Sequence, residues 1–587
     1  MPSQPAVDVT GSVSIVYDGC IYNSSCLKTD LSKCGTVIKT GEDPELILYL
    51  YRESGMECLK RIQGDFAFAL WDGNLRKLIL ARDRFGIKPL FYYQSERGRF
   101  LFSSEIDAIL RSNLTDKELD LASLYHYFFL TFCPQPSTII KKVKSVPPAT
   151  YVEYDVERDT ITTIPYWDIP CTDNKTLLQE EEILEECGRL LTESVRLRSP
   201  VNRKVGISLS SGMDSCTIAG FLDKFEPQMN TFTFGFGEKH GHLNEFSLSR
   251  LVAEKIGANH QEIRITGKDL LNALPSLARC LDTPTAGAIL PYFFLMKAQE
   301  FGIQVAFRGD GGNSAFQYLF DEKMPALDKG LSFLRMLPNR MQTSLYNVFD
   351  GIFSLAAKRS RGSSTKLQGL FGLLSRYFSL MAGTVNFASM YSERERGGFF
   401  KLTDWMNNKE FRGTRDIVLS YFNTNVRDLH ERYNYGDFKV YLDQGLTHLG
   451  SLSRSLSIDL RLPYFDHVLI EFIQRTVPSS LRQKNGIDKY ILKKIAEPVL
   501  PPEIINKNSR GFYMPFKEWL MTDLRPVVDD VFSRSTVDSR GIFNYKKVRT
   551  IYDRFYSRED SDISWRKIWA FVILEYWFRE HIDEKNN

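Results

Sequence analysis

The chain has 587 residues, of which 43% are hydrophobic and 25% charged, and its formal net charge is +3. This length exceeds one ordinary core and predicts two to four domains. The balanced charge gives no reason to expect a nucleic-acid partner, and no apolar run is long enough to span a bilayer. The first residues lack a signal-peptide pattern and the nine cysteines are scattered, so we expect a cytoplasmic protein with reduced thiols and no structural zinc.

The first 165 residues alternate between short strand patterns and one clear helix. We expect the first ten residues to be frayed and a helix at residues 43–53, with Pro44 in its first turn. A hairpin turns at Asp72-Gly73-Asn74. The predicted strands are residues 12–17, 64–71, 77–82, 91–93 and 100–102. This pattern indicates a layered α+β domain.

From residue 174 onward, strands and helices alternate in a different way. An amphipathic helix at 174–196 leads into strands at 205–209, 231–236, 260–265 and 303–307, with helices from residue 213 and at 244–256 between them. Such alternation predicts a parallel, doubly wound sheet. Ligands of these sheets bind beyond the carboxyl ends of the strands. The loops after Leu209, Phe236 and Phe307 should therefore converge on a nucleotide.

The loop after the first of these strands carries the most informative residues. Ser210-Ser211-Gly212 forms a turn of small residues between an apolar strand and a helix that starts at Met213. Backbone N–H groups and a helix N-terminus suit phosphate, and Asp214 beside phosphate suits Mg²⁺. The loop is not a Walker A sequence, and an ordinary strand-to-helix turn is the alternative interpretation.

This loop resembles the pyrophosphate loop, Ser-Gly-Gly-x-Asp-Ser, of ATP pyrophosphatases, with Ser211 in place of a glycine. The small serine is compatible if the backbone there does not need a positive φ. The resemblance implies ATP and Mg²⁺ as ligands. It assigns to nucleotide binding Leu209, Ser210, Ser211, Gly212, Asp214, Ser215, Phe234 and Gly309.

The N-terminal part resembles the glutaminase domain of glutamine-dependent asparagine synthetases in residues 18–23, 64–71, 81–90 and 103–106. The nucleophile of that family is an N-terminal cysteine whose free α-amine acts as base. Here Met1 is followed by Pro2, and Cys20 stands where the family has a glutamate. Without a thiolate and its base, the acyl-enzyme route is closed. We expect residues 1–165 to be a truncated, inactive class II glutamine amidotransferase-like domain, which an upstream start encoding Met-Cys-Gly would revive.

A second loop, Arg308-Gly309-Asp310-Gly311-Gly312-Asn313-Ser314, is similar to the family's Ser-Gly-Asp/Glu-Gly-Gly/Ser-Asp-Glu. The resemblance places Asp310 near the acyl-adenylate and the amine. Asn313 matches a carboxylate that helps to hold Mg²⁺, and Ser314 matches a glutamate. An amide oxygen can coordinate Mg²⁺ but brings no charge, so we expect weaker metal binding through Asp214 and Asn313. A plain turn is the alternative.

The C-terminal part matches the family in three stretches, residues 457–466, 486–492 and 509–520. A family lysine that faces the phosphates corresponds to Ser509, with Lys507 and Arg510 adjacent but off register. A cation opposite transition-state charge is often a large catalytic contribution. The resemblance implies Asp310, Lys489 and Arg510 as catalytic residues. Residues 325–440 show no clean match and predict a divergent helical insertion near the acceptor substrate, and residues 568–582 predict an amphipathic helix.

Together these features predict an α/β protein. A truncated Ntn-glutaminase-like α+β domain is followed, at 175–587, by a doubly wound parallel-sheet ATP pyrophosphatase domain with a helical C-terminal part. The resemblance implies an ATP-dependent ligase that adenylates a carboxylate, releases pyrophosphate and joins the acyl group to an amine. Related β-lactam synthetases and lasso-peptide cyclases also lack the cysteine, which favours a natural-product tailoring or cyclising enzyme.

Two alternatives stay open. One is an ammonia-dependent asparagine synthetase, and the other is a pseudoenzyme or scaffold subunit with a weakened nucleotide site. The expected partners are a small-molecule or peptide carboxylate and an amine, either ammonia or an amine of the substrate itself. A homodimer is also possible, and no membrane partner is expected.

Overall fold

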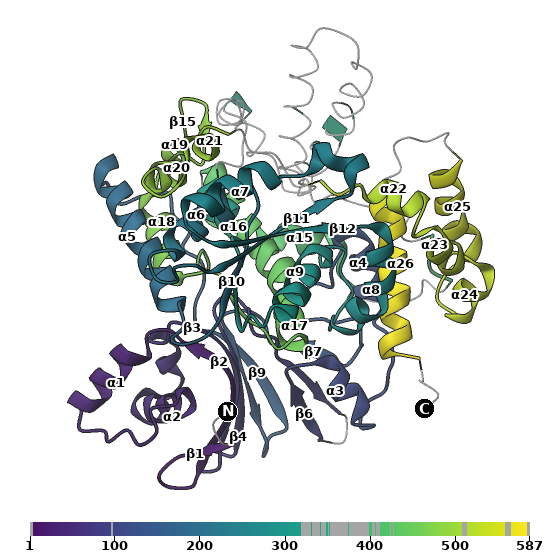
Figure 1. The fold of residues 1–587 in the computed structure, drawn as a ribbon. Helices are drawn as coiled ribbons and strands as arrows, with labels where there is room; N and C mark the ends of the chain where they lie inside the picture. The colour runs from purple at the N-terminus through teal and green to yellow at the C-terminus, as the bar shows by residue number, and fades with distance from the viewer. Residues whose placement is uncertain are drawn as a thin grey trace.

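The computed structural model describes residues 4–317 except 96 and 97, scattered positions between 318 and 410, and 411–583 except 423, 427, 508–512 and 558–564. It is a mixed α/β structure. Two antiparallel sheets lie in the N-terminal part, and a parallel sheet lies in the rest of the chain. In the view of Figure 1 the antiparallel sheets are at the bottom and the parallel sheet is above them. The predicted insertion at 325–440 lies mostly outside the described residues.

The larger antiparallel sheet has six strands in the order β1-β2-β3-β4-β8-β9. They are β1 (Ala6–Val7), β2 (Val13–Ile21), β3 (Gly64–Asp72), β4 (Lys77–Arg82), β8 (Thr150–Asp155) and β9 (Thr160–Pro165). The predicted hairpin is confirmed, and Asp72 closes its turn by accepting the N–H groups of Asn74 and Leu75 at 2.9 and 3.0 Å. The prediction that the first ten residues fray was wrong for β1. The Asp8 side chain accepts the Ser12 and Val13 N–H groups, turning the chain so that β1 pairs with β2.

The smaller antiparallel sheet and four helices complete the N-terminal part. The sheet has the order β6-β5-β7, with β5 (Phe91–Gln94), β6 (Phe100–Ser103) and β7 (Val143–Ser145). The helices are α1 (Ser24–Lys33), α2 (Asp43–Ser54), α3 (Ile106–Arg111) and α4 (Leu121–Leu130). Leu46, Ile47 and Leu50 of α2 are fully buried in one core with Phe66 and Phe68 of β3. The helix predicted at residues 43–53 thus covers one face of the larger sheet.

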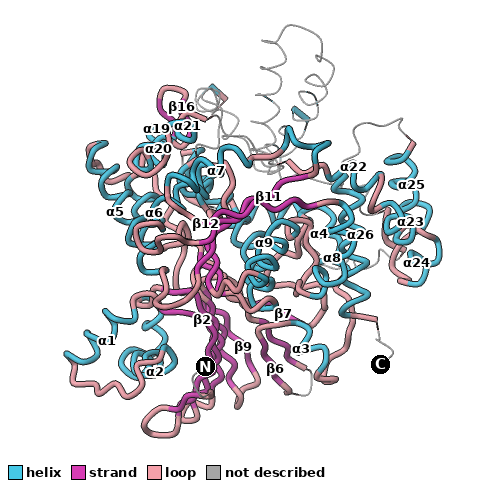
Figure 2. Tube along the Cα trace, viewed as in Figure 1, coloured by secondary structure: helices cyan, strands magenta, loops and turns pink. Residues whose placement is uncertain are grey.

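The parallel sheet has five strands in the order β12-β11-β10-β13-β14, all parallel to their neighbours. They are β10 (Val205–Ser208), β11 (Asn230–Phe236), β12 (Asn259–Ile265), β13 (Val305–Phe307) and β14 (Asp459–Arg461). The first four match the predicted strands to within two residues. Figure 2 shows helices on either side of the parallel strands. The chain order reverses between β10 and β13, and such a reversal opens a crevice for ligands.

The helices of this part connect the strands. They are α5 (Glu180–Arg198), α6 (Met213–Leu222), α7 (Phe246–Lys255), α8 (Gly267–Arg279), α9 (Ile289–Glu300) and α10 (Gly312–Phe316). The helix predicted at 174–196 begins later, at Glu180. Gln179 and Glu182 form a capping box there, which satisfies the first N–H groups of the helix and fixes its start.

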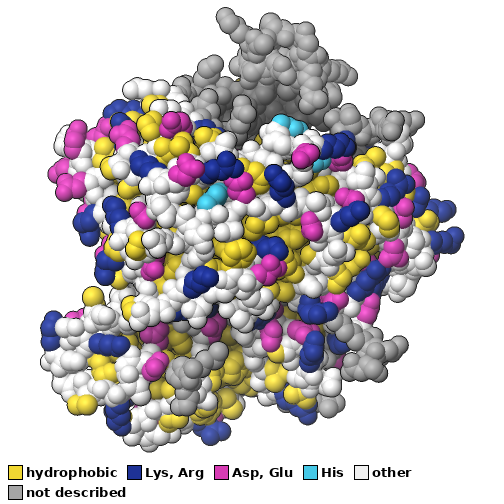
Figure 3. Space-filling model, viewed as in Figure 1, with side chains coloured by type: hydrophobic (Ala, Val, Ile, Leu, Met, Phe, Trp, Pro, Cys, Tyr) yellow, Lys and Arg dark blue, Asp and Glu magenta, His cyan; other side chains and the backbone are white. Residues whose placement is uncertain are grey.

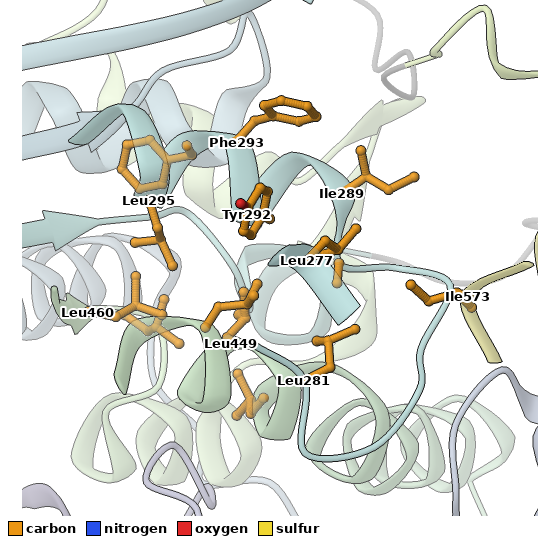
Figure 4. Packing of buried hydrophobic residues seen from close by; sticks show 14 of the residues in the cluster. Leu277, Leu281, Ile289, Tyr292, Phe293, Leu295, Leu449, Leu460 and Ile573 are labelled. Carbon is orange, nitrogen blue, oxygen red and sulfur yellow. The ribbon is translucent and has the colours of Figure 1, made fainter. Parts of the chain in front are cut away.

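The C-terminal part is helical. It contains α15 (Thr414–Tyr421), α16 (Leu429–Tyr441), a π-helical turn (Leu442–Leu446), α17 (Thr447–Ser455), α18 (His467–Thr476), α19 (Ser479–Arg482), the hairpin of β15 (Gln483–Lys484) and β16 (Ile487–Asp488), α20 (Tyr490–Ala496), α21 (Pro502–Ile505), α22 (Phe516–Met521), α23 (Arg525–Val531), α24 (Arg534–Ser539), α25 (Tyr545–Tyr556) and α26 (Trp565–His581). Figure 4 shows how α8, α9, α17, β14 and α26 share one core through Leu277, Tyr292, Leu449, Leu460 and Ile573.

The last helix, α26, was predicted to be amphipathic, but it is buried on most of its sides. Both Trp569 and Trp577 are fully buried, and so are most residues between them. The reason is that α8 packs on one side of α26 while α22, α23 and α25 pack on others. Among the described residues, no helix has the length and apolar composition that a membrane crossing needs. Figure 3 shows charges of both signs interspersed over one face of the molecule.

Buried charges join the N-terminal sheets to the parallel-sheet part. Asp466 accepts hydrogen bonds from Gln63 Nε2 at 2.6 Å and from Arg198 Nη1 at 2.9 Å. The Arg198 and Arg461 guanidinium groups lie 4.4 and 4.9 Å from the ring centroid of Tyr22. The Tyr22 hydroxyl donates to Asp65 at 2.5 Å. These contacts fix the two parts against each other.

Helix α16 and the π-helical turn are also tied to the N-terminal part. Lys439 and Tyr435 each lie 2.8 Å from a carboxylate oxygen of Asp168. The Gln135 N–H donates to Asp443 at 2.9 Å. The N-terminal part therefore helps to set the position of α16.

Candidate active site

A cavity of about 460 Å³ lies where the parallel sheet reverses its chain order. Its walls come from the loops that follow β10 and β13, from β11, and from the C-terminal half of α16. The structure brings together on this wall nine of the residues predicted from sequence: Leu209, Ser210, Gly212, Asp214, Ser215, Phe234, Gly309, Asp310 and Asn313. Their roles in catalysis and binding stay predictions.

The loop after β10 is held by its own side chains. The Ser210 N–H donates to the Ser215 hydroxyl at 3.1 Å, and the Gly212 N–H donates to the Ser210 hydroxyl at 3.0 Å. Ser211 is not among the described residues with positive φ, so its backbone does not need a glycine. The loop therefore tolerates the serine and leads directly into the N-terminus of α6, where the first N–H groups have no partners within the helix.

Two glycines let the loop after β13 pack closely on the start of α6, Gly309 against its backbone and Gly312 against the Asp214 side chain. A Cβ atom on Gly309 would lie 2.7 Å from the Ser215 nitrogen, and one on Gly312 would lie 2.4 Å from an Asp214 oxygen. Any side chain at either position would push the loops apart. Residues 309–312 thus hold Asp310 and Asn313 close to Asp214.

Asp214 is paired with Lys489 behind this wall. The Lys489 ammonium lies 2.7 Å from both Asp214 oxygens, and Lys489 itself is almost fully buried. Burial raises the pKa of Asp214, and the attraction of Lys489 opposes that shift. The predicted metal ligand and the predicted catalytic cation therefore neutralise each other in this structure.

Asp310 is also neutralised. Arg308 Nε donates to it at 2.7 Å, and the Tyr441 hydroxyl donates at 3.0 Å. Burial opposes the charge, yet Arg308 and Tyr441 together hold the pKa of Asp310 below its ordinary value. Sequence reasoning placed Asp310 beside the amine, but it did not foresee that Arg308, two residues earlier, would occupy this carboxylate.

Asp437 is a third carboxylate on the wall, which the sequence did not predict. It projects from α16, and its carboxylate accepts a hydrogen bond from the Ser314 hydroxyl at 3.2 Å. Burial raises the pKa of Asp437 to about 6. The residue lies within the stretch at 325–440 that matched no motif, so no local signal could have found it.

Lys507 was not among the predicted site residues, because it lies two positions before the family's lysine position. Its ammonium contacts the Ser211 hydroxyl and lies 3.6 Å from Glu245, which accepts the Ser211 N–H at 3.0 Å. A cation thus lies at the predicted pyrophosphate loop, although its position in the sequence is off register. Arg510 and Ser509 lie outside the described residues.

One further group in the described part of the chain could hold a metal ion, formed by Asp428, His430 and Glu431. The Lys175 ammonium lies 2.8 Å from a Glu431 oxygen, so this carboxylate already has a positive partner. The group lies at the start of α16, and none of its residues lines the cavity.

Comparisons with known proteins agree with this geometry. The family model for asparagine synthase matches residues 186–579, and a glutamine amidotransferase domain model matches residues 1–167. Asparagine synthetase [glutamine-hydrolyzing] 1 of Bacillus subtilis is 27% identical over 97% of this chain and 86% of its own length. A putative asparagine synthetase [glutamine-hydrolyzing] of Mycobacterium bovis is 27% identical over 97% of this chain and 85% of its own length. Amidase chry2 of Gibberella zeae is 23% identical over 97% and 88%, respectively.

Proposed function

Because this chain belongs to the asparagine synthase family, we propose that it is an ATP-dependent ligase that forms an amide bond through an acyl-adenylate. The single observation that carries the proposal is the convergence of the loops after β10 and β13 on one cavity, with Asp214 at its wall and Lys489 behind Asp214. In this reaction a substrate carboxylate oxygen attacks the α-phosphorus of ATP and pyrophosphate leaves. An amine then attacks the acyl carbon and AMP leaves.

The residues around the cavity suit ATP and Mg²⁺. The N-terminus of α6 and residues 210–215 offer N–H groups to the phosphates. Asp214 and Asn313 offer the carboxylate and amide oxygens that Mg²⁺ prefers, and Lys489 shows that a cation is stable beside Asp214. These two residues would hold Mg²⁺, which when bound supplies charge that offsets the phosphates. Lys489, beside Asp214, would add a positive charge near the same phosphates.

We assign a phosphate-binding role to Lys507. Its contact with Ser211 supports this assignment, because residue 211 lies in the middle of the predicted pyrophosphate loop. Lys507 would replace the cation that the family pattern has at position 509. The Glu245 carboxylate orients Lys507, because it lies close to both the Ser211 N–H and the Lys507 ammonium.

The N-terminal part is proposed to be a glutaminase-like domain without activity. Cys20, which stands on β2, does not suit a nucleophile because burial raises its pKa and so disfavours the thiolate. The nitrogen donor is then free ammonia or an amine of the substrate. A direct test offers glutamine or ammonium chloride as nitrogen source. Amide formation with ammonium alone is expected, and equal rates with glutamine would refute the silent domain.

We further propose a natural-product tailoring or cyclising role, rather than asparagine synthesis. The support is the set of departures from the family pattern at Ser211, Asn313, Ser314 and Ser509. Ammonia-dependent synthesis of asparagine is the second candidate, and L-aspartate is therefore the first carboxylate to assay. We also propose that the protein is cytoplasmic.

The experiment is ATP binding by calorimetry with and without Mg²⁺, on the wild type and on Asp214→Ala. Magnesium-dependent binding that Asp214→Ala abolishes supports the ligase. Pyrophosphate and AMP release with candidate carboxylates then identifies the substrate. No binding at millimolar ATP would refute the proposal and favour a scaffold role.

A further inference from the structure

We propose that Asp437 is the anchor for the amine substrate, which enters the cavity as a primary ammonium ion, and that it accepts a proton that the nitrogen loses. This inference rests on the ligase function proposed above and names the chemical class of its second substrate.

Three carboxylates border the cavity, and two of them are already neutralised. Asp214 is paired with Lys489 at 2.7 Å, and Asp310 is paired with Arg308 at 2.7 Å. For Asp437, the structure gives one hydroxyl, that of Ser314, and no described charged group shifts its pKa. An enclosed carboxylate without a cation costs free energy, which a positively charged ligand would recover. The cavity is therefore preset to attract a cation at this wall.

The position of Asp437 favours the amine over the other ligands. The loop after β13 supplies Ser314, and one turn along α16 from Asp437 lies Tyr441, which touches Asp310. Residues four apart share a helix face, so Asp437 and Tyr441 both face this loop. At the pyrophosphate loop after β10 each acidic side chain has a lysine beside it, Lys489 at Asp214 and Lys507 at Glu245. An ammonium ion is thus drawn to the side occupied by Asp437, Ser314 and Tyr441.

Asp437 also suits the proton transfer better than Asp310. Arg308 stabilises the charged form of Asp310 and weakens it as a base. The raised pKa of Asp437, about 6, is closer to working pH, as general-base catalysis requires. Asp437 takes one proton from the bound ammonium ion, and the nitrogen lone pair freed in this way forms the bond to the acyl carbon. The bond from that carbon to the AMP phosphate oxygen breaks, and AMP leaves with the bonding electrons. The second proton that the nitrogen loses passes to solvent.

The first test measures binding and does not need the carboxylate substrate. The full-length wild type is titrated with ammonium chloride, against sodium chloride at equal ionic strength, and the thermal midpoint is followed. The variant is Asp437→Asn, which keeps the size of the side chain. The matched control is Asp443→Asn, because burial raises the pKa of Asp443 to about 6 as well, while this residue lines a different cavity.

We expect an ammonium-specific rise of the midpoint in the wild type and in Asp443→Asn, and its loss in Asp437→Asn. Equal shifts in all three proteins, or none in the wild type, would overturn the assignment. A third outcome would also overturn it. If Asp437→Asn weakens magnesium-dependent ATP binding as strongly as Asp214→Ala does, Asp437 is a metal ligand instead.

The second test separates this inference from the ligase proposal. With ATP, Mg²⁺ and L-aspartate, the product is followed with ammonium chloride or with hydroxylamine, a strong nucleophile that is uncharged near neutral pH. Asp437→Asn should raise the KM for ammonium at least about tenfold and leave the KM for hydroxylamine unchanged, while the loss of the proton acceptor lowers kcat with both nucleophiles. Equal changes of the two KM values would refute the anchor. No product from the wild type with either nucleophile would count against the ligase acting on this carboxylate, and the binding comparison would still decide the role of Asp437.

Discussion

The ammonium nitrogen of Lys489 lies 2.7 Å from each carboxylate oxygen of Asp214, so one buried pair contains both the predicted metal ligand and the predicted catalytic cation. Each carboxylate oxygen has a second lone pair, so Asp214 can offer oxygen to Mg²⁺ while it keeps Lys489 in contact. The pair therefore places a positive charge directly beside the predicted metal ligand.

Lys489→Gln should reduce pyrophosphate release strongly without weakening magnesium-dependent ATP binding. The substitution leaves Asp214 available to Mg²⁺. It removes, however, a positive charge that stabilises the negative charge of the transition state. A loss of roughly 100-fold or more in rate is expected, as for other preorganised electrostatic contacts. Pyrophosphate release and calorimetry measure the two effects. The control is Lys484→Gln, whose lysine pairs with Glu180 away from the cavity, and a normal rate in Lys489→Gln would contradict the assignment.

Lys507→Ala should weaken ATP binding by about 10- to 100-fold, because a charge-assisted contact to phosphate contributes roughly 1.5–3 kcal/mol. Calorimetry with Mg²⁺ measures this change. The matched rescue is Ser509→Lys in the same variant, which places a lysine where the family pattern has one. If Lys507→Ala binds ATP like the wild type, Lys507 only supports the loop through Ser211 and Glu245.

Asp437→Asn should stabilise the protein at high pH while impairing amine transfer. Burial raises the pKa of Asp437 from the ordinary 3.8 to about 6, so its ionisation opposes folding. This cost is absent below pH 3.8, grows as the pH rises to 6 and is fully present above it, at about 3 kcal/mol. The thermal midpoint of the variant should therefore exceed that of the wild type at pH 8, and the gap should shrink toward pH 5. A variant that is less stable at pH 8 would show that Asp437 has a cationic partner.

Asp466→Ala should destabilise the junction between the N-terminal and parallel-sheet parts. The substitution leaves the Arg198 guanidinium, whose side chain is only 2% exposed, without its ionic partner. Removing one member of a buried pair costs roughly 3–5 kcal/mol. Thermal unfolding and limited proteolysis would detect it. Asp168→Ala, which removes the half-exposed partner of Lys439, should cost at most about 1 kcal/mol, and equal effects of the two variants would contradict this account.

The sequence predicted those parts of the site that are continuous in the chain. A strand, a turn of small residues and a helix are local patterns, so residues 205–215 and 303–314 could be placed correctly from period and turn chemistry alone. At Ser211 the sequence could state only the condition that its φ must not be positive, and the structure shows that this condition is met. The parallel sheet followed from the alternation of its elements.

The missed parts depend on contacts between distant residues. Asp437 and Ser314 are 123 positions apart, and Lys507 and Ser211 are 296 apart. No local pattern shows that α16 turns one face to the loop after β13. Arg308 was visible beside Asp310, but only the folded loop shows that the two side chains pair. Helix α26 is likewise buried on most sides because α22, α23 and α25 pack against it. This packing cannot be deduced from the sequence of α26 itself.

The ties between α16 and the N-terminal part have a consequence for the cavity. Asp168 holds Tyr435 and Lys439 of α16, the helix that presents Asp437 and Tyr441 to the cavity, and Gln135 holds Asp443 in the π-helical turn that follows it. A change at residue 135 or 168 can therefore alter the cavity from a distance, whether or not their domain handles glutamine. The N-terminal part is a brace for this helical segment, so the segment's geometry depends on residues far outside the parallel-sheet part.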